Sequence, residues 1–194
     1  MRGLVVVKLG GGLARVTGGL GAAGEAVSRA ARHRPLLVVP GGGVLADAVR
    51  AAEEELELSP AAAHWMALLA MDQYAYAITG ALPDGVVVHD LGEIGQALAA
   101  RQVPVLAPYR WMLAADALPH RWEITSDSIA AFIAGALDAD LLVLLKPVAG
   151  PVETLVDPCF QEVVPRGLKV VVLGSAELER LEDVVLEPGR SAAV

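Results

Sequence analysis

Short apolar runs rich in Val and Leu recur along the chain and alternate with Ala-rich stretches of helical length. This alternation is typical of α/β folds in which a largely parallel sheet is covered on both faces. The expected strands are Leu4 to Leu9, Pro35 to Val39, Gly85 to His89, Val103 to Leu106, Leu141 to Leu145 and Lys169 to Leu173. The expected helices are Leu20 to Arg32, Gly43 to Glu55, Ala61 to Gly80, Glu93 to Ala100 and Ser126 to Leu137. We expect a short hairpin or an irregular lid from Pro147 to Pro165, and a weak closing element from Val184 to Leu186.

Length and composition favour one domain over residues 1–194, since a chain of 194 residues with 55% apolar side chains can bury one substantial core. Mean hydropathy is +0.52, but runs such as Leu141 to Leu145 are far shorter than the roughly 20 residues that span a bilayer. Cys159 is the only cysteine, so no disulfide can form within the chain. The N-terminus enters a β-like run without the apolar segment of a secretory signal, so we expect a cytoplasmic protein.

The chain is acidic, with a formal net charge of −8 and a pI near 4.9. Nucleic acids and anionic membrane surfaces attract clustered Lys and Arg, so neither is an expected partner. Anions would have to be bound locally, by backbone N–H groups, helix N-termini or a few cations. Glu53, Glu54, Glu55 and Glu57 are expected to be a solvated helix end and not a metal site.

Two expected strands end in glycine runs. The first is Val5 to Leu9, which contains Lys8 and continues as Gly10-Gly11-Gly12. Glycines allow backbone N–H groups to approach phosphate oxygens, and the lysine adds a positive charge beside them. The order differs from a P-loop, because the lysine precedes the glycines. A flexible turn after an edge-strand lysine is the equally weighted alternative for this segment alone.

The second glycine run, Gly41-Gly42-Gly43, follows the strand at Pro35 to Val39 and precedes a helix. One such turn is common in α/β proteins. Ligands of open parallel sheets lie beyond the carboxyl ends of the strands, so two runs could face one crevice.

A third segment, Ile124 to Ala131, opens an Ala-rich helix with Thr125-Ser126-Asp127-Ser128. Ser and Asp cap helix starts whether or not a ligand is present, which is the alternative interpretation. The strand at Leu141 to Leu145 then ends in Lys146 and turns at Gly150, supplying a second cation at a strand end.

The order of these segments resembles the amino acid kinase superfamily, which includes acetylglutamate, uridylate, isopentenyl phosphate and fosfomycin kinases. The resemblance runs from Lys8 to Gly150. It implies a three-layer αβα sandwich with a mostly parallel sheet, like carbamate kinase, and ATP with Mg²⁺ as the phosphoryl donor. No metal-ligating residues of the protein are expected. It also implies that Lys8 and Lys146 contact the transferring phosphoryl group and that Asp127 organises the lysines.

The resemblance further assigns residues to the two substrates. Those implied for the nucleotide are Gly10, Gly11, Gly12, Lys146 and Gly150, and those implied for the acceptor are Gly41, Gly42, Gly43, His64 and Ser126. Where relatives have a Thr-Asp-Val-Asp-Gly-like stretch, this chain reads Lys146 to Gly150, and the nucleotide-covering region after about residue 150 is reduced. The second catalytic lysine normally comes from that region, so Lys169 stays open beside Lys146.

The short form and the segment Ala63 to Tyr74 look most like the aminomethylfuran phosphate kinases of methanofuran biosynthesis, which convert a phosphomonoester to a diphosphate. His64 would then assist the acceptor phosphate, or simply pack against Trp65. Arg110, Trp111 and Trp122 would contact the acceptor or line an oligomer interface. An isopentenyl phosphate kinase and a nucleotide-binding regulatory protein without turnover are the alternatives, and we expect a homodimer or higher homo-oligomer.

Overall fold

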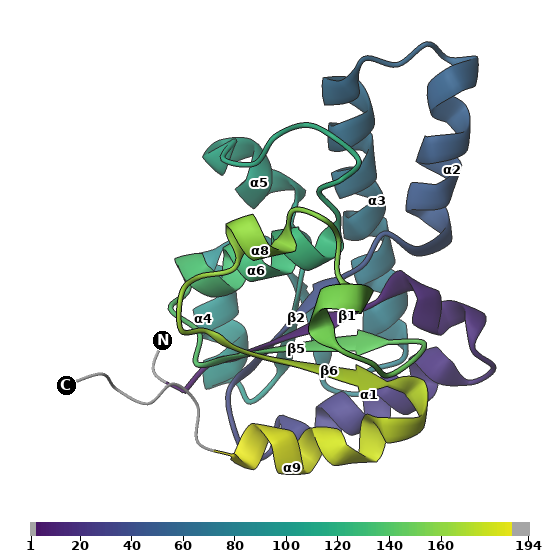
Figure 1. The fold of residues 1–194 in the computed structure, drawn as a ribbon. Helices are drawn as coiled ribbons and strands as arrows, with labels where there is room; N and C mark the ends of the chain where they lie inside the picture. The colour runs from purple at the N-terminus through teal and green to yellow at the C-terminus, as the bar shows by residue number, and fades with distance from the viewer. Residues whose placement is uncertain (1–2, 188–194) are drawn as a thin grey trace.

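The computed structural model describes residues 3–187 and is built on one six-stranded sheet (Figure 1). Residues 1–2 and 188–194 of the expected domain lie outside this described part. The strands are β1 (Val5–Leu9), β2 (Leu36–Pro40), β3 (Gly85–Val88), β4 (Val103–Leu106), β5 (Leu141–Lys146) and β6 (Lys169–Gly174). Their order is β3-β4-β2-β1-β5-β6, and every neighbouring pair is parallel. The α/β fold expected from the alternating pattern is confirmed.

Eleven helical elements, counted over residues 3–187, connect the strands. They are η1 (Gly11–Arg15), α1 (Gly19–Ala30), α2 (Gly43–Glu55), α3 (Pro60–Gly80), α4 (Leu91–Ala99), α5 (Tyr109–Ala115), α6 (Ser126–Ala136), α7 (Val152–Leu155), α8 (Phe160–Val163), η2 (Ser175–Arg180) and α9 (Leu181–Leu186). The segment expected as a hairpin or irregular lid contains the short helices α7 and α8. The expected closing element belongs to α9, and α5 was not expected.

Helices cover the sheet on both faces, because side chains along each strand alternate in direction. On β1, Val5, Val7 and Leu9 pack in the same core as α1 and α9. Leu4 and Val6 pack in the opposite core, together with α4 and α6. Figure 1 shows α1 and α9 side by side below the sheet and α4, α6 and α8 on its other side. Both cores are built mainly from aliphatic side chains, which explains why the strands read as continuous Val and Leu runs.

The helical hairpin of α2 and α3 projects beyond the carboxyl end of the sheet (Figure 1). Ser59 caps α3, its side chain accepting from the Ala62 N–H at 3.2 Å, and Pro60 occupies the first helical position. No residue of α2 is buried. The helix therefore depends on α3 and on contacts across the neighbouring hollow for its position.

Over residues 3–187, the structure has no helix that is both long enough and apolar enough to cross a membrane.

Candidate active site

The two glycine runs lie in direct contact at the carboxyl ends of β1 and β2. A Cβ atom at Gly11 would come within 2.3 Å of the Gly43 nitrogen, and one at Gly41 within 2.5 Å of the Gly11 nitrogen. Contacts under 3 Å to backbone atoms exclude any side chain. Gly43 also has φ of +55°, which disfavours other residues. The sequence therefore needs glycine at this place because two backbones meet there.

These loops supply backbone N–H groups to one region. The η1 and α2 helices begin at Gly11 and Gly43, and neither N-terminus has a side-chain cap. The first N–H groups of a helix have no partner within the helix and carry a partial positive charge. Two uncapped N-termini side by side form the kind of site that binds phosphate oxygens.

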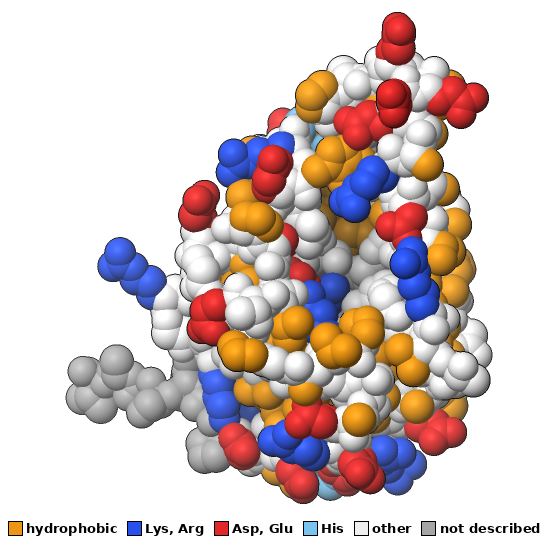
Figure 2. All heavy atoms as spheres, turned by 45° about the vertical axis from the view of Figure 1, so that its right-hand side comes forward, with side chains coloured by type: hydrophobic (Ala, Val, Ile, Leu, Met, Phe, Trp, Pro, Cys, Tyr) orange, Lys and Arg blue, Asp and Glu red, His pale blue; other side chains and the backbone are white. Residues whose placement is uncertain are grey.

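A cavity of about 340 Å³ opens beside the two loops. Figure 2 shows the hollow between the projecting hairpin and the body of the molecule, with Lys or Arg side chains at its base and rim. Its lining combines loop glycines, an apolar floor and polar walls: Gly11, Gly12, Arg15, Gly42, Gly43, Ala46, Asp47, Arg50, Pro60, His64, Ala67, Leu68, Met71, Arg121, Trp122, Ile124, Thr125, Ser126 and Ile129. The cavity thus unites residues from both glycine loops, α2, α3 and the start of α6.

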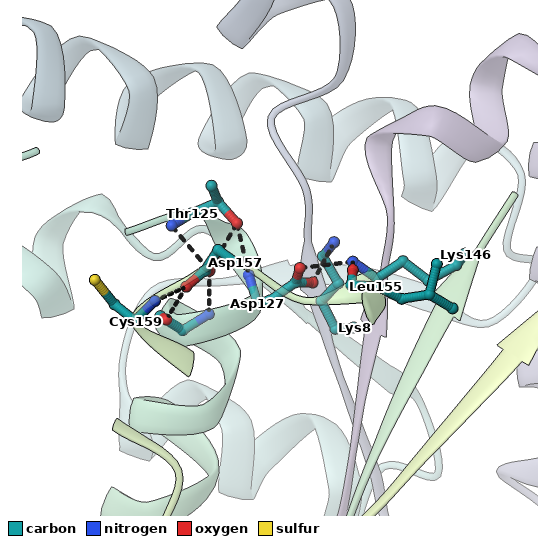
Figure 3. A network of polar contacts seen from close by, with 8 residues as sticks. Lys8, Thr125, Asp127, Lys146, Leu155, Asp157 and Cys159 are labelled. Carbon is teal, nitrogen blue, oxygen red and sulfur yellow. Dashed lines mark hydrogen bonds and ion pairs between the residues drawn. The ribbon is translucent and has the colours of Figure 1, made fainter. Parts of the chain in front are cut away.

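Two lysines converge on one carboxylate beneath the loops (Figure 3). Lys8 and Lys146 lie on the adjacent strands β1 and β5, two positions apart in register, and share the face covered by α6. The Lys8 Nζ is 2.9 Å from Asp127 Oδ1, and the Lys146 Nζ is 2.6 Å from Asp127 Oδ2. The structure therefore brings together the three residues expected to be catalytic.

Asp127 is almost fully buried between the lysines, with 4% of its surface exposed. Burial by itself would raise the pKa of this carboxyl, but Lys8 and Lys146 outweigh it and hold the pKa below the usual range. Burial and repulsion by Lys8 lower the pKa of Lys146, while Asp127 partly restores it. The Asp127 carboxyl is thus held in its ionised form between the two lysines.

Side chains of α2 form one wall of the cavity and connect it to the opposite side. Arg15 of η1 forms an ion pair with Asp47. The Arg50 guanidinium lies 4.5 Å from the centre of the Trp122 ring, and the Trp122 Nε1 donates to Glu53. The acidic run was expected to be a solvated helix end, and within it Glu53 accepts the Trp122 N–H and orients this ring at the cavity.

His64 lines the same cavity from α3. Its ring stacks on His120 at 4.5 Å and meets Trp65 edge-on at 4.9 Å. Burial and the neighbouring His120 lower its pKa to about 4, against an opposing effect of Asp116. The ring is consequently neutral at pH 7, so it can offer a phosphate a hydrogen bond but no charge.

Other expected residues lie elsewhere. Lys169 begins β6 opposite Leu141, at the amino edge of the sheet, and its Nζ is 2.6 Å from Glu187. Because Lys146 pairs with Gly174 at the far end of the same strand, Lys169 cannot share a site with Asp127. Gly150 lies on the exposed turn after β5, against Leu155, and is not part of the cavity lining.

Trp122 lies at the candidate site, but Arg110 and Trp111 do not. They line a second, more open hollow with His89 and Asp90, on α4 and α5. Of the three residues considered for acceptor contact, only Trp122 lines the cavity beside the glycine loops.

Several residues of this region escaped the sequence analysis. Asp47 and Arg50 share one face of α2 with Gly43, at the spacing of three and four residues that a helix repeats. Asp157 is a buried carboxylate in the stretch that showed no periodicity. The available signals were this helical spacing and an aspartate set between apolar residues, as in Val156-Asp157-Pro158-Cys159.

Residues 3–187 include no group of three or more His, Cys, Asp or Glu side chains that could hold a metal ion. Asp127 is engaged by two lysines, and Asp47 of the cavity wall forms an ion pair with Arg15. Mg²⁺ commonly binds through substrate phosphates with few protein ligands, and only that mode suits these residues.

Comparison with known proteins places this geometry in a family. A family model described as the amino acid kinase family matches residues 3–150. The chain belongs to the amino acid kinase family. A curated relative, the [5-(aminomethyl)furan-3-yl]methyl phosphate kinase of Methanocaldococcus jannaschii, is 28% identical over 120 residues, which cover 61% of this chain. The matched region covers only 54% of that relative's length.

Two solved structures of the family share the fold. UMP kinase from Ureaplasma parvum matches with a TM-score of 0.70 at 14% identity, covering 96% of both chains. Uridylate kinase from Archaeoglobus fulgidus matches with a TM-score of 0.58 at 24% identity, covering 75% of this chain and 64% of that one. The three-layer amino acid kinase fold is therefore confirmed, with the glycine loops and lysines inside the matched family region.

Proposed function

We propose that this protein is an ATP-dependent kinase that phosphorylates a small phosphomonoester, [5-(aminomethyl)furan-3-yl]methyl phosphate, to its diphosphate. The observation that carries the proposal is the meeting of Lys8, Lys146 and Asp127 with two uncapped glycine loops beside one cavity. The named activity of the Methanocaldococcus relative supports this choice of acceptor.

Phosphoryl transfer requires in-line positioning and stabilisation of charge on the transferred group. An oxygen of the acceptor phosphate attacks the γ-phosphorus of ATP, the bond to the β–γ bridging oxygen breaks, and ADP leaves. That attacking oxygen is already ionised near neutral pH, so no general base is needed. Lys8, Lys146 and the loop N–H groups would stabilise the equatorial oxygens, while Mg²⁺ would enter with the nucleotide and neutralise its phosphates.

The cavity suits a small, planar acceptor with a phosphate at one end. Leu68, Met71 and Ile129 provide apolar surface, and Trp122 provides a fixed ring. Arg50 adds positive charge, and the ion pair of Arg15 and Asp47 adds a carboxylate that could approach an amine. An aminomethylfuran phosphate combines these features in one molecule.

The test is ADP production by purified protein with ATP, Mg²⁺ and a series of acceptors. We expect ADP formation that depends on the aminomethylfuran phosphate, with slower turnover of isopentenyl phosphate and UMP. Faster turnover of isopentenyl phosphate than of the aminomethylfuran phosphate would contradict the proposed acceptor and identify an isopentenyl phosphate kinase. Tight ATP binding by calorimetry without turnover of any acceptor would contradict catalysis and favour a regulatory protein.

Trp122 offers a second prediction, because its ring is held by Arg50 and Glu53 at the cavity wall. We expect Trp122→Ala to raise the acceptor KM about tenfold, equivalent to about 1.4 kcal/mol and within the range of aromatic contacts. The KM for ATP should stay unchanged. Trp122→Phe keeps an aromatic ring, although a smaller one, and loses the donor to Glu53. Its acceptor KM should therefore lie between those of the wild type and Trp122→Ala. Equal KM values in all three proteins would exclude an aromatic contact with the acceptor.

A further inference from the structure

Asp157 accepts five hydrogen bonds in the connection between α7 and α8, although only 8% of its surface is exposed. Its Oδ2 accepts from the Thr125 N–H at 3.0 Å, the Thr125 Oγ1 at 2.8 Å and the Ser128 N–H at 3.0 Å. Its Oδ1 accepts from the Ser128 Oγ at 2.5 Å and the Cys159 N–H at 3.2 Å. Figure 3 shows this carboxylate at the start of α6, next to the lysine pair.

Four of these five hydrogen bonds come from Thr125, the N-cap residue of α6, and from Ser128 in its first turn, where Asp127 is the second helical residue. An aspartate in a first turn is attracted to the free N–H groups of its own helix. Here Asp157 takes the Ser128 N–H, a donor that a local carboxylate or cap would otherwise use. Asp127 is thereby left to direct both of its oxygens to Lys8 and Lys146.

The same connection also holds Lys146. Its Nζ donates to the Leu155 carbonyl at 2.7 Å, in addition to Asp127. Leu155 and Asp157 are two residues apart, so one short segment fixes both the lysine and the helix that carries Asp127. The charged groups that act on Lys146 are Lys8 from β1, Asp127 from α6 and Asp157 itself, whose negative charge favours the protonated amine.

We propose that Asp157 is a positioning residue, whose hydrogen bonds to the start of α6 orient Asp127 and through it hold Lys146 in place for the transferring phosphoryl group. The catalytic part of this inference rests on the proposed function. The ordering of Asp127 and Lys146 stands on the hydrogen bonds alone. Asp157 itself lies at the start of α6 and does not line the cavity, so it would act through the other two residues.

Asp157→Asn is the sharpest variant, because it keeps the size of the side chain and removes its charge. The amide oxygen can retain the three bonds at the Oδ2 position, while the amide nitrogen would face the Cys159 N–H donor. Asp140→Asn is the matched control. It weakens the ion pair with Arg34, 2.6 Å long, at the amino edge of the sheet and away from the site.

Lysine NMR gives a readout that needs no turnover, since the chain has only three lysines, Lys8, Lys146 and Lys169. In protein labelled with ¹³Cε-lysine, we expect Asp157→Asn to move the Lys146 titration to lower pH, because a favourable negative charge is lost. The Lys169 titration should not move. In Asp140→Asn, all three titrations should match the wild type.

The kinetic readout uses the ATP and acceptor assay. We expect Asp157→Asn to lower kcat at least about tenfold, with the acceptor KM within about twofold and the alkaline limb of kcat at lower pH. Asp140→Asn should lower the Tm without changing kcat.

An unmoved Lys146 titration, or an unchanged kcat with a Tm loss like that of Asp140→Asn, would overturn the proposal. A shifted Lys146 titration in a protein without any turnover would count against the kinase and support the positioning of Lys146.

Discussion

Replacing Lys8 with Ala is expected to lower kcat by about 100-fold or more, the cost of losing one preorganised electrostatic donor at a reacting centre. Lys8 is the penultimate residue of β1, two positions before the glycine run, and its Nζ is 2.9 Å from Asp127 Oδ1. The variant loses a positive charge beside the loops and leaves Asp127 with Lys146 as its remaining cation. The measurement is acceptor-dependent ADP formation, accompanied by circular dichroism to show that the fold is retained.

Lys169→Ala is the control for this experiment. It removes an equal charge from the amino edge of the sheet, where the pair with Glu187 is exposed to solvent and contributes little to stability. Its kcat should equal that of the wild type. Normal turnover in a folded Lys8→Ala protein would show that phosphoryl transfer does not require Lys8.

The second large effect is expected for Gly11→Ala. The new Cβ would come within 2.3 Å of the Gly43 nitrogen and 2.4 Å of its Cα, and neither atom can move without separating the two loops. Overpacking of this kind costs about 1–3 kcal/mol of stability. Because the loops also supply the expected phosphate-binding N–H groups, kcat should fall by about 100-fold. Thermal unfolding and the ADP assay measure the two effects.

Gly21→Ala provides the matched glycine control. Gly21 lies on the exposed side of α1, where a Cβ meets no atom within 4 Å. Alanine favours helices over glycine by about 1 kcal/mol, so the Tm should rise slightly and kcat should stay the same. A Gly11→Ala protein as active and as stable as Gly21→Ala would contradict the close contact between the two glycine loops.

Much of the fold could be predicted from the sequence because the strands are continuous apolar runs covered on both faces. All six strands lie within one residue of their expected bounds. The convergence of Lys8 and Lys146 also followed from the sequence, because residues at the carboxyl ends of parallel strands meet at one edge, whereas the place of Asp127 beside them was implied by the family resemblance. The exclusion of Lys169 needed the register, which places it opposite Leu141.

The residues that escaped prediction depend on contacts between segments far apart in the chain. Glu53 reads as part of a solvated acidic run, and only the approach of Trp122 gives it a partner. Asp157 lies in a stretch without helical or strand periodicity, and its role follows from its bonds to Thr125 and Ser128. The periodicity of neighbouring residues in the sequence does not indicate contacts between distant segments. The expected homo-oligomer and the acceptor contact of Ser126 stay predictions.

The central claim is that the two glycine loops and the lysine pair form one phosphate-binding cradle. A crystal structure with a non-hydrolysable ATP analogue, Mg²⁺ and the acceptor phosphate tests it most directly. We predict that the γ-phosphoryl group lies within about 3 Å of the Lys8 Nζ and of N–H groups in both loops. The acceptor phosphate should occupy the cavity lined by Trp122 and His64. Nucleotide phosphates bound away from Lys8 and Gly11, such as in the hollow beside Arg110, would contradict the account.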